Sequence, residues 1–290
     1  MNNRVSAKVI AAADEAGANM GSMLFQQGKI TQEQVDSVLR LQAAEGLRFG
    51  EAALRLGLVS ESDIQQVLSR QFDYPYLQVG QGNYPSTLKA AYQPFSEEVE
   101  ALRSVRSQLM LRWFSGGRKT LAIVSVNPGA GTSLLAANLA IVFSQLGQRT
   151  LLVDANLRTP CQHKIFNLSA GHGLADVLAG RAGLDVLAAA ESFIDLSLLP
   201  AGTHVPNPQE LLHRASFGVI NDRLRDRFDI ILYDTPAFST AADAMTIAAR
   251  AGGVLLVVRR DHTRVTDIAA FSEQLRHSGT EVVGSVLVGF

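Results

Sequence analysis

The chain has 290 residues, of which 47% are hydrophobic and 18% are charged, and its formal net charge is −1. This composition is typical of a globular protein, and the balanced charge excludes a global field that would attract nucleic acid. The single cysteine, Cys161, excludes an internal disulfide and suits a reducing compartment. No segment resembles a signal peptide, and none approaches the roughly 18 apolar residues of a membrane span. We therefore expect a cytoplasmic protein.

The N-terminal third contains a repeat, in which the segments starting at Gly21 and Gly50 match. Gly28 and Gly57 occupy equivalent places and predict the end of a first helix in each unit, since glycine adopts the left-handed conformation after a helix. A capping box then predicts the start of a second helix in each unit. The capping pairs are Thr31 with Gln34 and Ser60 with Asp63. The apolar stripes that follow are Val35, Val38 and Leu39, and then Ile64, Val67 and Leu68. The sequence predicts a small all-helical repeat domain over residues 1–72.

Residues 73–96 break this pattern and predict a linker. Pro75, Pro85 and Pro94 interrupt any regular periodicity. Four of the five tyrosines also lie here, namely Tyr74, Tyr76, Tyr84 and Tyr92. Such a density of aromatic residues favours a connecting arm that packs against another part of the protein.

Residues 97–290 alternate between helix-like and strand-like segments. Ser96–Trp113 has the periodicity of a helix. Apolar runs typical of strands follow at Leu121–Val126, Thr150–Val153, Leu196–Leu199, Ile230–Tyr233, Val254–Val258 and Val282–Leu287. Near-continuous apolar strands separated by helices predict an α/β domain with a parallel sheet covered by helices on both faces.

A glycine-rich turn joins the first predicted strand to the next helix. Its candidate nucleotide-binding residues are Pro128, Gly129, Ala130, Gly131, Thr132, Ser133 and Leu134. A turn of this kind directs backbone N–H groups and a helix N-terminus at a phosphate, and Ser133 stands where a hydroxyl would bind Mg²⁺.

Two further strands end in an acid, Asp154 and Asp234. Because the carboxyl ends of parallel strands meet at one edge of the sheet, both carboxylates should face the phosphate loop. We predict them as the catalytic residues and, with Ser133, as the metal ligands. The expected ligand is a nucleotide with Mg²⁺, and the family resemblance described next implies that the nucleotide is ATP.

These elements together resemble the bacterial tyrosine kinases (BY-kinases) of polysaccharide export. Further matching segments are Arg158-Thr-Pro-Cys-Gln-His163, Gly173-Leu-Ala-Asp-Val-Leu, Leu199-Pro-Ala-Gly-Thr and Asp243-Ala-Met-Thr-Ile-Ala. The resemblance covers residues 95–290, and within the family the chain is similar to the EpsG type of exopolysaccharide clusters. It implies a P-loop fold, an ATP-dependent tyrosine kinase and a role in polymer chain length. It also implies a membrane chain-length-determinant protein as partner, and thus a peripheral place at the inner membrane.

The segment Glu100-Ala-Leu-Arg103-Ser-Val-Arg106 matches the E-x-x-R-x-x-R motif of the family, which implies subunit contacts in a homo-oligomer. Residues at this spacing lie near one helix face and can form ion pairs. An ordinary solvated charged face is the alternative.

The chain departs from the family pattern at the phosphate loop. Thr132 replaces the lysine, and Ala130 replaces a glutamate that is common there. Asn156 takes the place of the second acid after the second strand, and the chain reaches Phe290 without a tyrosine-rich tail. Losing the lysine removes a charge-assisted bond to phosphate, which costs about 1.5–3 kcal/mol, roughly 10- to 150-fold in affinity. We therefore expect weakened nucleotide binding and impaired catalysis. An active kinase with an unusual loop is the alternative.

The N-terminal repeat resembles the N-terminal domain of type II secretion ATPases, in which paired units can bind cyclic di-GMP. The second unit has a basic residue, Arg48, before its first glycine, whereas the first unit has Asn19. Arginine at such a position would stack on guanine or bind phosphate. A cyclic di-GMP-gated docking module is therefore a further hypothesis, beside plain docking of a partner protein.

Overall fold

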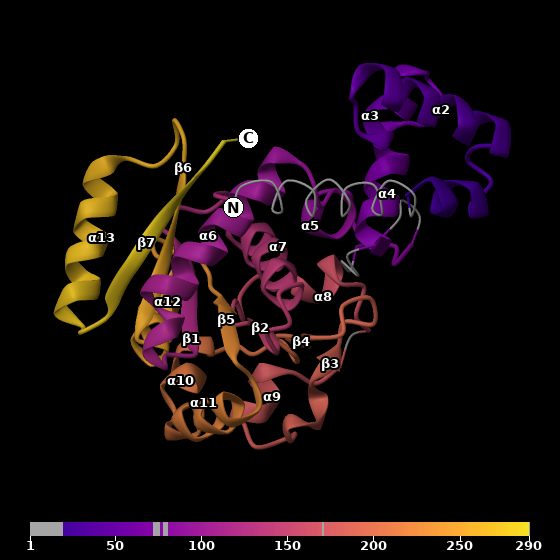
Figure 1. The fold of residues 1–290 in the computed structure, drawn as a ribbon. Coiled ribbons are helices and arrows are strands. Elements are labelled where there is room, and N and C mark those ends of the chain that lie inside the picture. Colours follow the sequence, from indigo (N-terminus) through magenta and orange to yellow (C-terminus); the bar gives the residue numbers. More distant parts are fainter. Residues whose placement is uncertain (1–19, 72–75, 78–80, 170, 290) are drawn as a thin grey trace. The chain divides into compact units, whose positions relative to one another are not determined.

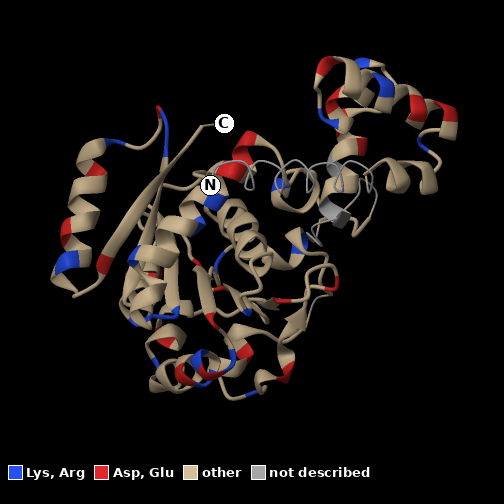
Figure 2. Cartoon of the chain, in the orientation of Figure 1, with Lys and Arg blue, Asp and Glu red and all other residues tan. Residues whose placement is uncertain are grey.

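The computed structural model describes residues 20–71, 76–77, 81–169 and 171–289 (Figure 1). The chain forms two compact units, residues 1–75 and 76–290. No helix within the described residues is long and apolar enough to cross a membrane. Acidic and basic residues are interspersed on the helices of the second unit (Figure 2).

The first unit is helical in its described part. Residues 20–26 form a helix, which is followed by α2 (Gln32–Glu45), α3 (Phe49–Arg55) and α4 (Glu61–Gln71). Gly28 and Gly57 have φ angles of 69° and 65°, the left-handed conformation that their places predicted. The Thr31 capping box is confirmed: the Thr31 N–H donates to Gln34 Oε1 at 2.8 Å, and the Gln34 N–H donates to Thr31 Oγ1 at 3.3 Å. Ser60 pairs in the same way with Asp63.

The repeat produces a reciprocal packing of its two units. A Cβ added to Gly21 would lie 3.0 Å from the Phe49 ring, and one added to Gly50 would lie 3.4 Å from Met20 Sδ. The absence of a side chain at Gly21 thus makes room for Phe49, which precedes Gly50, and the absence of one at Gly50 makes room for Met20, which precedes Gly21. Both side chains are buried in the core of this unit, where Leu24 and Val38 join them.

Residues 76–96 belong to the second unit, so that only the first part of the 73–96 segment lies outside it. The Leu77 N–H donates to Ala91 O at 2.8 Å, and the short helix α5 (Lys89–Tyr92) buries Ala90 and Ala91. Tyr84 packs edge-on against Phe166 at 5.9 Å and is stacked with Phe193 at 6.2 Å. The aromatic residues therefore hold this arm against the domain that follows.

A seven-stranded sheet organises the second unit. In chain order its strands are β1 (Thr120–Ser125), β2 (Thr150–Asp154), β3 (Ala188–Ala189), β4 (Leu196–Leu199), β5 (Ile230–Asp234), β6 (Gly253–Arg259) and β7 (Glu281–Val288). The spatial order is β3-β4-β2-β5-β1-β6-β7, and every neighbouring pair is parallel except β3 with β4. The six predicted strands are confirmed, whereas the two-residue β3 was not predicted, because so short a segment carries no periodicity.

Helices cover both faces of the sheet, as predicted. One face packs against α5, α6 (Glu97–Arg112) and α7 (Thr132–Ser144). The other face packs against α9 (Leu174–Leu178), α10 (Pro208–His213), α11 (Ala215–Arg227), α12 (Asp243–Ala251) and α13 (Val265–His277). The short helices η1 (Phe114–Gly116), α8 (Gln162–Ile165) and η2 (Leu184–Val186) complete the unit. Alternate strand residues face the two cores, as Ala122 and Ile123 do, because successive side chains of a strand point to opposite faces.

Candidate functional site

The glycine-rich loop connects the end of β1 to the start of α7. Gly129 and Gly131 have φ angles of 78° and 73°, a conformation that disfavours any side chain, and Gly131 is the N-cap residue of α7. The first N–H groups of a helix have no partner within it, so the loop and the α7 N-terminus offer donors to an anion.

A cavity of about 490 Å³ opens beside this loop. All seven predicted nucleotide-binding residues line it, together with Asn156, Arg158, Thr159 and Cys161 from the segment after β2 and Thr235, Pro236, Ala237 and Thr240 from the segment after β5. Thr132 is almost fully buried and lines the cavity at the position where the family has its lysine. The sheet thus brings the three predicted segments to one place.

The two predicted acids are neighbours that do not themselves line the cavity, and Asp154 is joined to one of its lining residues, Cys161. Asp154 and Asp234 are register partners on β2 and β5, and neither has any exposed surface. Asp154 Oδ2 accepts the N–H groups of Cys161 and Gln162 at 3.0 and 2.9 Å. Oδ1 of each acid has no hydrogen-bond partner among the described residues. We call these two atoms the open oxygens, because each is buried without a hydrogen-bond partner among the described residues. Two such carboxylates side by side need a cation or a proton.

The environment favours the neutral form of this pair. Burial raises the pKa of both carboxyls, and the negative charge of Asp234 raises that of Asp154 further. Backbone N–H donors from Gln162 and Cys161 oppose the rise at Asp154, while hydrogen bonds from Gln162 and Ser133 oppose it at Asp234. A divalent cation at the open oxygens would reverse the effect and hold both groups ionised.

Gln162 is a site residue that the sequence analysis missed. Its Nε2 donates to Ser133 O at 2.9 Å and to Asp234 Oδ2 at 2.8 Å, so one side chain joins the start of α7 to the end of β5. Its Oε1 is buried without a partner among the described residues. The only feature of the sequence that pointed to Gln162 was its place in the family-matching segment that begins at Arg158, and glutamine at that place follows no general rule for a binding site.

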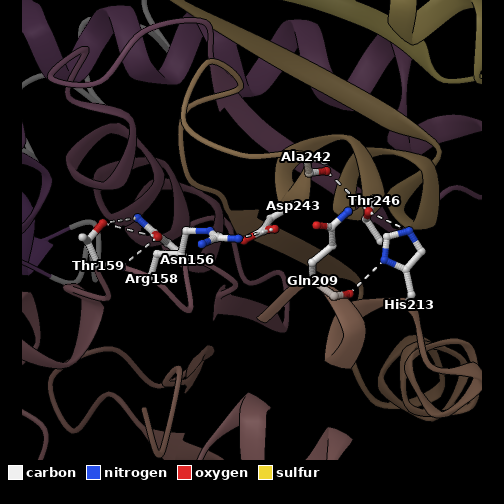
Figure 3. A network of polar contacts seen from close by, with 8 residues as sticks. All are labelled: Asn156, Arg158, Thr159, Gln209, His213, Ala242, Asp243 and Thr246. Atoms are coloured by element: carbon white, nitrogen blue, oxygen red, sulfur yellow. Dashed lines mark hydrogen bonds and ion pairs between the residues drawn. The ribbon is translucent and has the colours of Figure 1, made fainter. Parts of the chain in front are cut away.

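Asn156, which replaces the second acid of the family, closes a turn. The Thr159 N–H donates to Asn156 Oδ1 at 3.1 Å, and Asn156 Nδ2 donates to Thr159 Oγ1 at 3.1 Å (Figure 3). Cys161 follows this turn, and burial raises the pKa of its thiol to about 11, so it remains protonated at neutral pH.

Arg158 extends from the same turn to α12. Its Nε and Nη2 donate to the two carboxylate oxygens of Asp243 at 2.8 and 3.2 Å (Figure 3). Asp243 has 1% of its side chain exposed, whereas Arg158 has 37%. Lys164, the other basic residue near this segment, is exposed on α8 and does not line the cavity.

The residues present fit a magnesium nucleotide. The loop supplies backbone donors, Ser133 supplies a hydroxyl, and the open oxygens of Asp154 and Asp234 supply hard anionic ligands. No lysine occurs among the described residues that line the cavity. The cradle is therefore present, and the cation normally carried by the loop is absent.

The predicted interface residues lie on α6. Arg103 Nη1 donates to Glu100 Oε2 at 2.9 Å, and Glu100 is exposed. Arg106 Nη1 donates instead to Val142 O in the last turn of α7 at 2.9 Å. Arg106 therefore has a role within the unit, and Glu100 is the exposed residue of the motif.

The proposed cyclic di-GMP residue, Arg48, is exposed at the start of α3, where its backbone N–H donates to Glu51 Oε2 at 3.0 Å. Asn19 lies outside the described residues. Within the described residues of the first unit, nothing supports a cyclic di-GMP site.

The family model of the cellulose biosynthesis protein BcsQ matches residues 118–273. EpsB of Ralstonia solanacearum, described as a tyrosine-protein kinase, is 35% identical over 199 residues, which cover 69% of this chain and 26% of EpsB. CapB of Staphylococcus aureus, described in the same way, is 31% identical over 70% of this chain and 90% of CapB. The chain thus spans about a quarter of EpsB and most of CapB.

Solved structures agree with these relatives. The kinase domain of the Escherichia coli tyrosine kinase ETK superposes with a TM-score of 0.69 at 28% identity, over 72% of this chain and 81% of that domain. The septum site-determining protein MinD of Pyrococcus horikoshii, solved with Mg-ADP, superposes with a TM-score of 0.52 at 25% identity, over 58% of this chain and 69% of MinD. The chain therefore matches the BcsQ family model and belongs to the bacterial tyrosine kinase family.

Proposed function

We propose that the chain binds a magnesium nucleotide and acts as a tyrosine-kinase-like regulator of exopolysaccharide biosynthesis with impaired phosphoryl transfer. The observation that carries this proposal is the pair of open carboxylate oxygens on Asp154 and Asp234 beside an intact phosphate loop. A purely structural turn would not require two buried acids that each keep one oxygen without a partner among the described residues, because such an oxygen costs free energy in the absence of a ligand.

Each group has a defined role in this proposal. Backbone N–H groups of residues 129–134 bind the phosphates, and the Ser133 hydroxyl and the two carboxylates hold Mg²⁺ directly or through its waters. Bound Mg²⁺ neutralises phosphate charge. Gln162 keeps Asp234 and the start of α7 at a fixed separation through its two hydrogen bonds. The cavity is thus preorganised for the phosphates of ATP or ADP.

Catalysis is the function that the loop substitution should reduce most. Phosphoryl transfer depends on positioning and on charge stabilisation, and the family lysine contributes to both. Thr132 has a hydroxyl but no charge, so it offers at most a neutral hydrogen bond to the transferred phosphoryl group, where lysine would supply a charge-assisted one. An active kinase is the second candidate, and it is favoured by one observation, the presence of the Arg158 guanidinium at the cavity.

Partners follow from the same family membership. We propose that the chain docks on a membrane chain-length-determinant protein of polysaccharide export, which would hold it at the inner membrane. Glu100, with 67% of its side chain exposed, would contact a second subunit in a homo-oligomer, and Arg103, with 17% exposed, would hold it in place through their ion pair. The helical first unit would serve as a docking module.

Equilibrium binding tests the proposal. Calorimetric titration of the full chain with Mg-ATP and Mg-ADP should show binding that EDTA weakens by about tenfold or more, since the carboxylates act through the metal. Asp234→Asn should lose this metal dependence. The proposal fails if neither nucleotide binds, and autophosphorylation at a rate of the order of 1 s⁻¹ would favour the active kinase.

A further inference from the structure

We propose that Arg158, oriented by the buried carboxylate of Asp243, is the phosphate-binding cation of this cavity and takes over part of the role of the lysine that Thr132 replaces. The proposal rests on the nucleotide binding proposed above and adds to it the group that recognises the terminal phosphate.

Charge selects Arg158. Eighteen described residues line the cavity, and Arg158 is the one charged side chain among them. The rest of the lining consists of small, hydroxyl-bearing or apolar side chains with the amide of Asn156. An anionic ligand in this cavity would therefore meet the guanidinium as its one cationic side chain in the described lining.

The geometry indicates that the Arg158 guanidinium is held in a fixed orientation by Asp243. Asp243 is the first residue of α12, is almost fully buried, and binds Arg158 through both carboxylate oxygens. A bidentate pair fixes the plane of a guanidinium. The two bonds use Nε and Nη2 of Arg158, so Nη1 is not engaged by Asp243. The Asn156–Thr159 turn fixes the backbone that carries this side chain (Figure 3).

Two other basic residues, Arg259 and Lys164, are weaker candidates for the phosphate-binding cation. Arg259 Nη1 donates to Gly129 O at 3.0 Å, yet Arg259 does not belong to the cavity lining. Lys164 is exposed on α8 and also lies outside the lining. Arg259 therefore braces the loop, whereas Arg158 has access to the ligand.

The position also predicts which phosphate is recognised. A phosphate loop takes the α- and β-phosphates on its backbone, and the lysine of the loop reaches the β- and γ-phosphates. Arg158 approaches from the segment after β2, so the phosphate left for it is the terminal one of ATP. Asp243 cancels part of its charge, which makes the pair a weaker substitute than a free lysine and leaves room for improvement by Thr132→Lys.

A double-mutant cycle on the full chain tests this proposal. The four proteins are the parent, Arg158→Gln, Thr132→Lys and the double variant, each titrated calorimetrically with Mg-ATP and with Mg-ADP. Arg158→Gln should weaken ATP binding by about tenfold and ADP binding by less than about threefold. In the Thr132→Lys background the same change should weaken ATP binding by less than about threefold, because the lysine then contacts the same phosphate.

Arg181→Gln is the matched control, since Arg181 also pairs with a buried acid, Asp176, at 3.4 Å but lies away from the cavity lining. It should leave both affinities unchanged. If Arg158→Gln folds poorly, Arg158→Gln/Asp243→Asn removes the orphaned buried charge and should show the same selective loss of ATP affinity.

Two results would overturn the proposal, and they differ in meaning. If the Arg158 variants bind ATP as tightly as the parent does, and ADP as tightly as the parent does, nucleotide binding is intact and the Arg158–Asp243 pair is purely structural. Absence of any nucleotide binding by the parent would remove the proposed function, and the role of Arg158 with it.

Discussion

Asp154 and Asp234 face each other as register partners on β2 and β5, and each keeps one buried oxygen without a partner among the described residues. Two neighbouring negative charges that are buried away from solvent destabilise the fold unless they share a proton or a metal ion. This pair is the feature on which the proposed nucleotide binding rests, although the loop beside it has lost its lysine.

The acid pair predicts an unusual dependence of stability on pH. Between the ordinary aspartate pKa of 3.8 and the raised values of the folded state, the folded protein holds protons that the unfolded chain has released. The free energy of unfolding of the metal-free protein should therefore fall as pH rises through this window. Urea denaturation of the parent and of Asp154→Asn/Asp234→Asn, in EDTA, measures the two slopes.

The free energy of unfolding should depend less steeply on pH in the double variant than in the parent. Asp63 and Asp176, whose pKa values are lowered to about 2, contribute the opposite slope, but they do so below 3.8 and equally in both proteins. At pH 7, Mg²⁺ alone should stabilise the parent and not the variant. Identical slopes would mean that the pair is not coupled to protons as described.

Gln162 should matter for both stability and binding. Gln162→Leu keeps the side-chain size but removes the donor to Asp234 and Ser133, which should cost about 1–3 kcal/mol of folding free energy, since buried acceptors lose their partner. Nucleotide affinity should fall as well, because the start of α7 is no longer tied to β5. Gln145→Leu serves as control, since Gln145 donates to Ala90 O at 3.1 Å, away from the cavity lining. Full nucleotide affinity in Gln162→Leu would contradict the positioning role.

We expect Arg103 and Arg106 on α6 to have different roles, Arg103 in subunit assembly and Arg106 in the stability of the fold. Arg103→Glu should lower the molecular mass in light scattering if Arg103 and Glu100 contact a neighbouring subunit. Arg106→Glu should instead lower the melting temperature, because it removes the donor to Val142 O and places a negative charge near the C-terminal end of α7. An unchanged mass in Arg103→Glu would favour a solvated charged face.

Much of the fold could be predicted from the sequence because its signals are local. The glycines at 28 and 57 and the Thr31 capping box depend on nearby residues, and the six longer strands are apolar runs. The convergence of Asp154 and Asp234 followed from one rule about parallel sheets.

The missed parts of the site depend on contacts between distant segments. Gln162 reaches Asp234 across 72 positions, and Arg158 reaches Asp243 across 85. Neither pair has a spacing that a sequence pattern could register. The same holds for the arm, where the Ala90 N–H donates to Asn138 Oδ1 on α7 at 2.8 Å, so that the predicted linker could not be assigned to the second unit in advance.

Restoring the lysine tests the central claim most directly, namely that the cradle is intact and lacks only one charge. Thr132→Lys in the full chain, titrated with Mg-ATP by calorimetry, should bind at least about tenfold more tightly than the parent, the lower end expected for a charge-assisted bond. Adding Asp234→Asn should cancel much of the gain by weakening the metal site. If Thr132→Lys folds but gains no ATP affinity, the loop is no longer a phosphate cradle and the account is wrong.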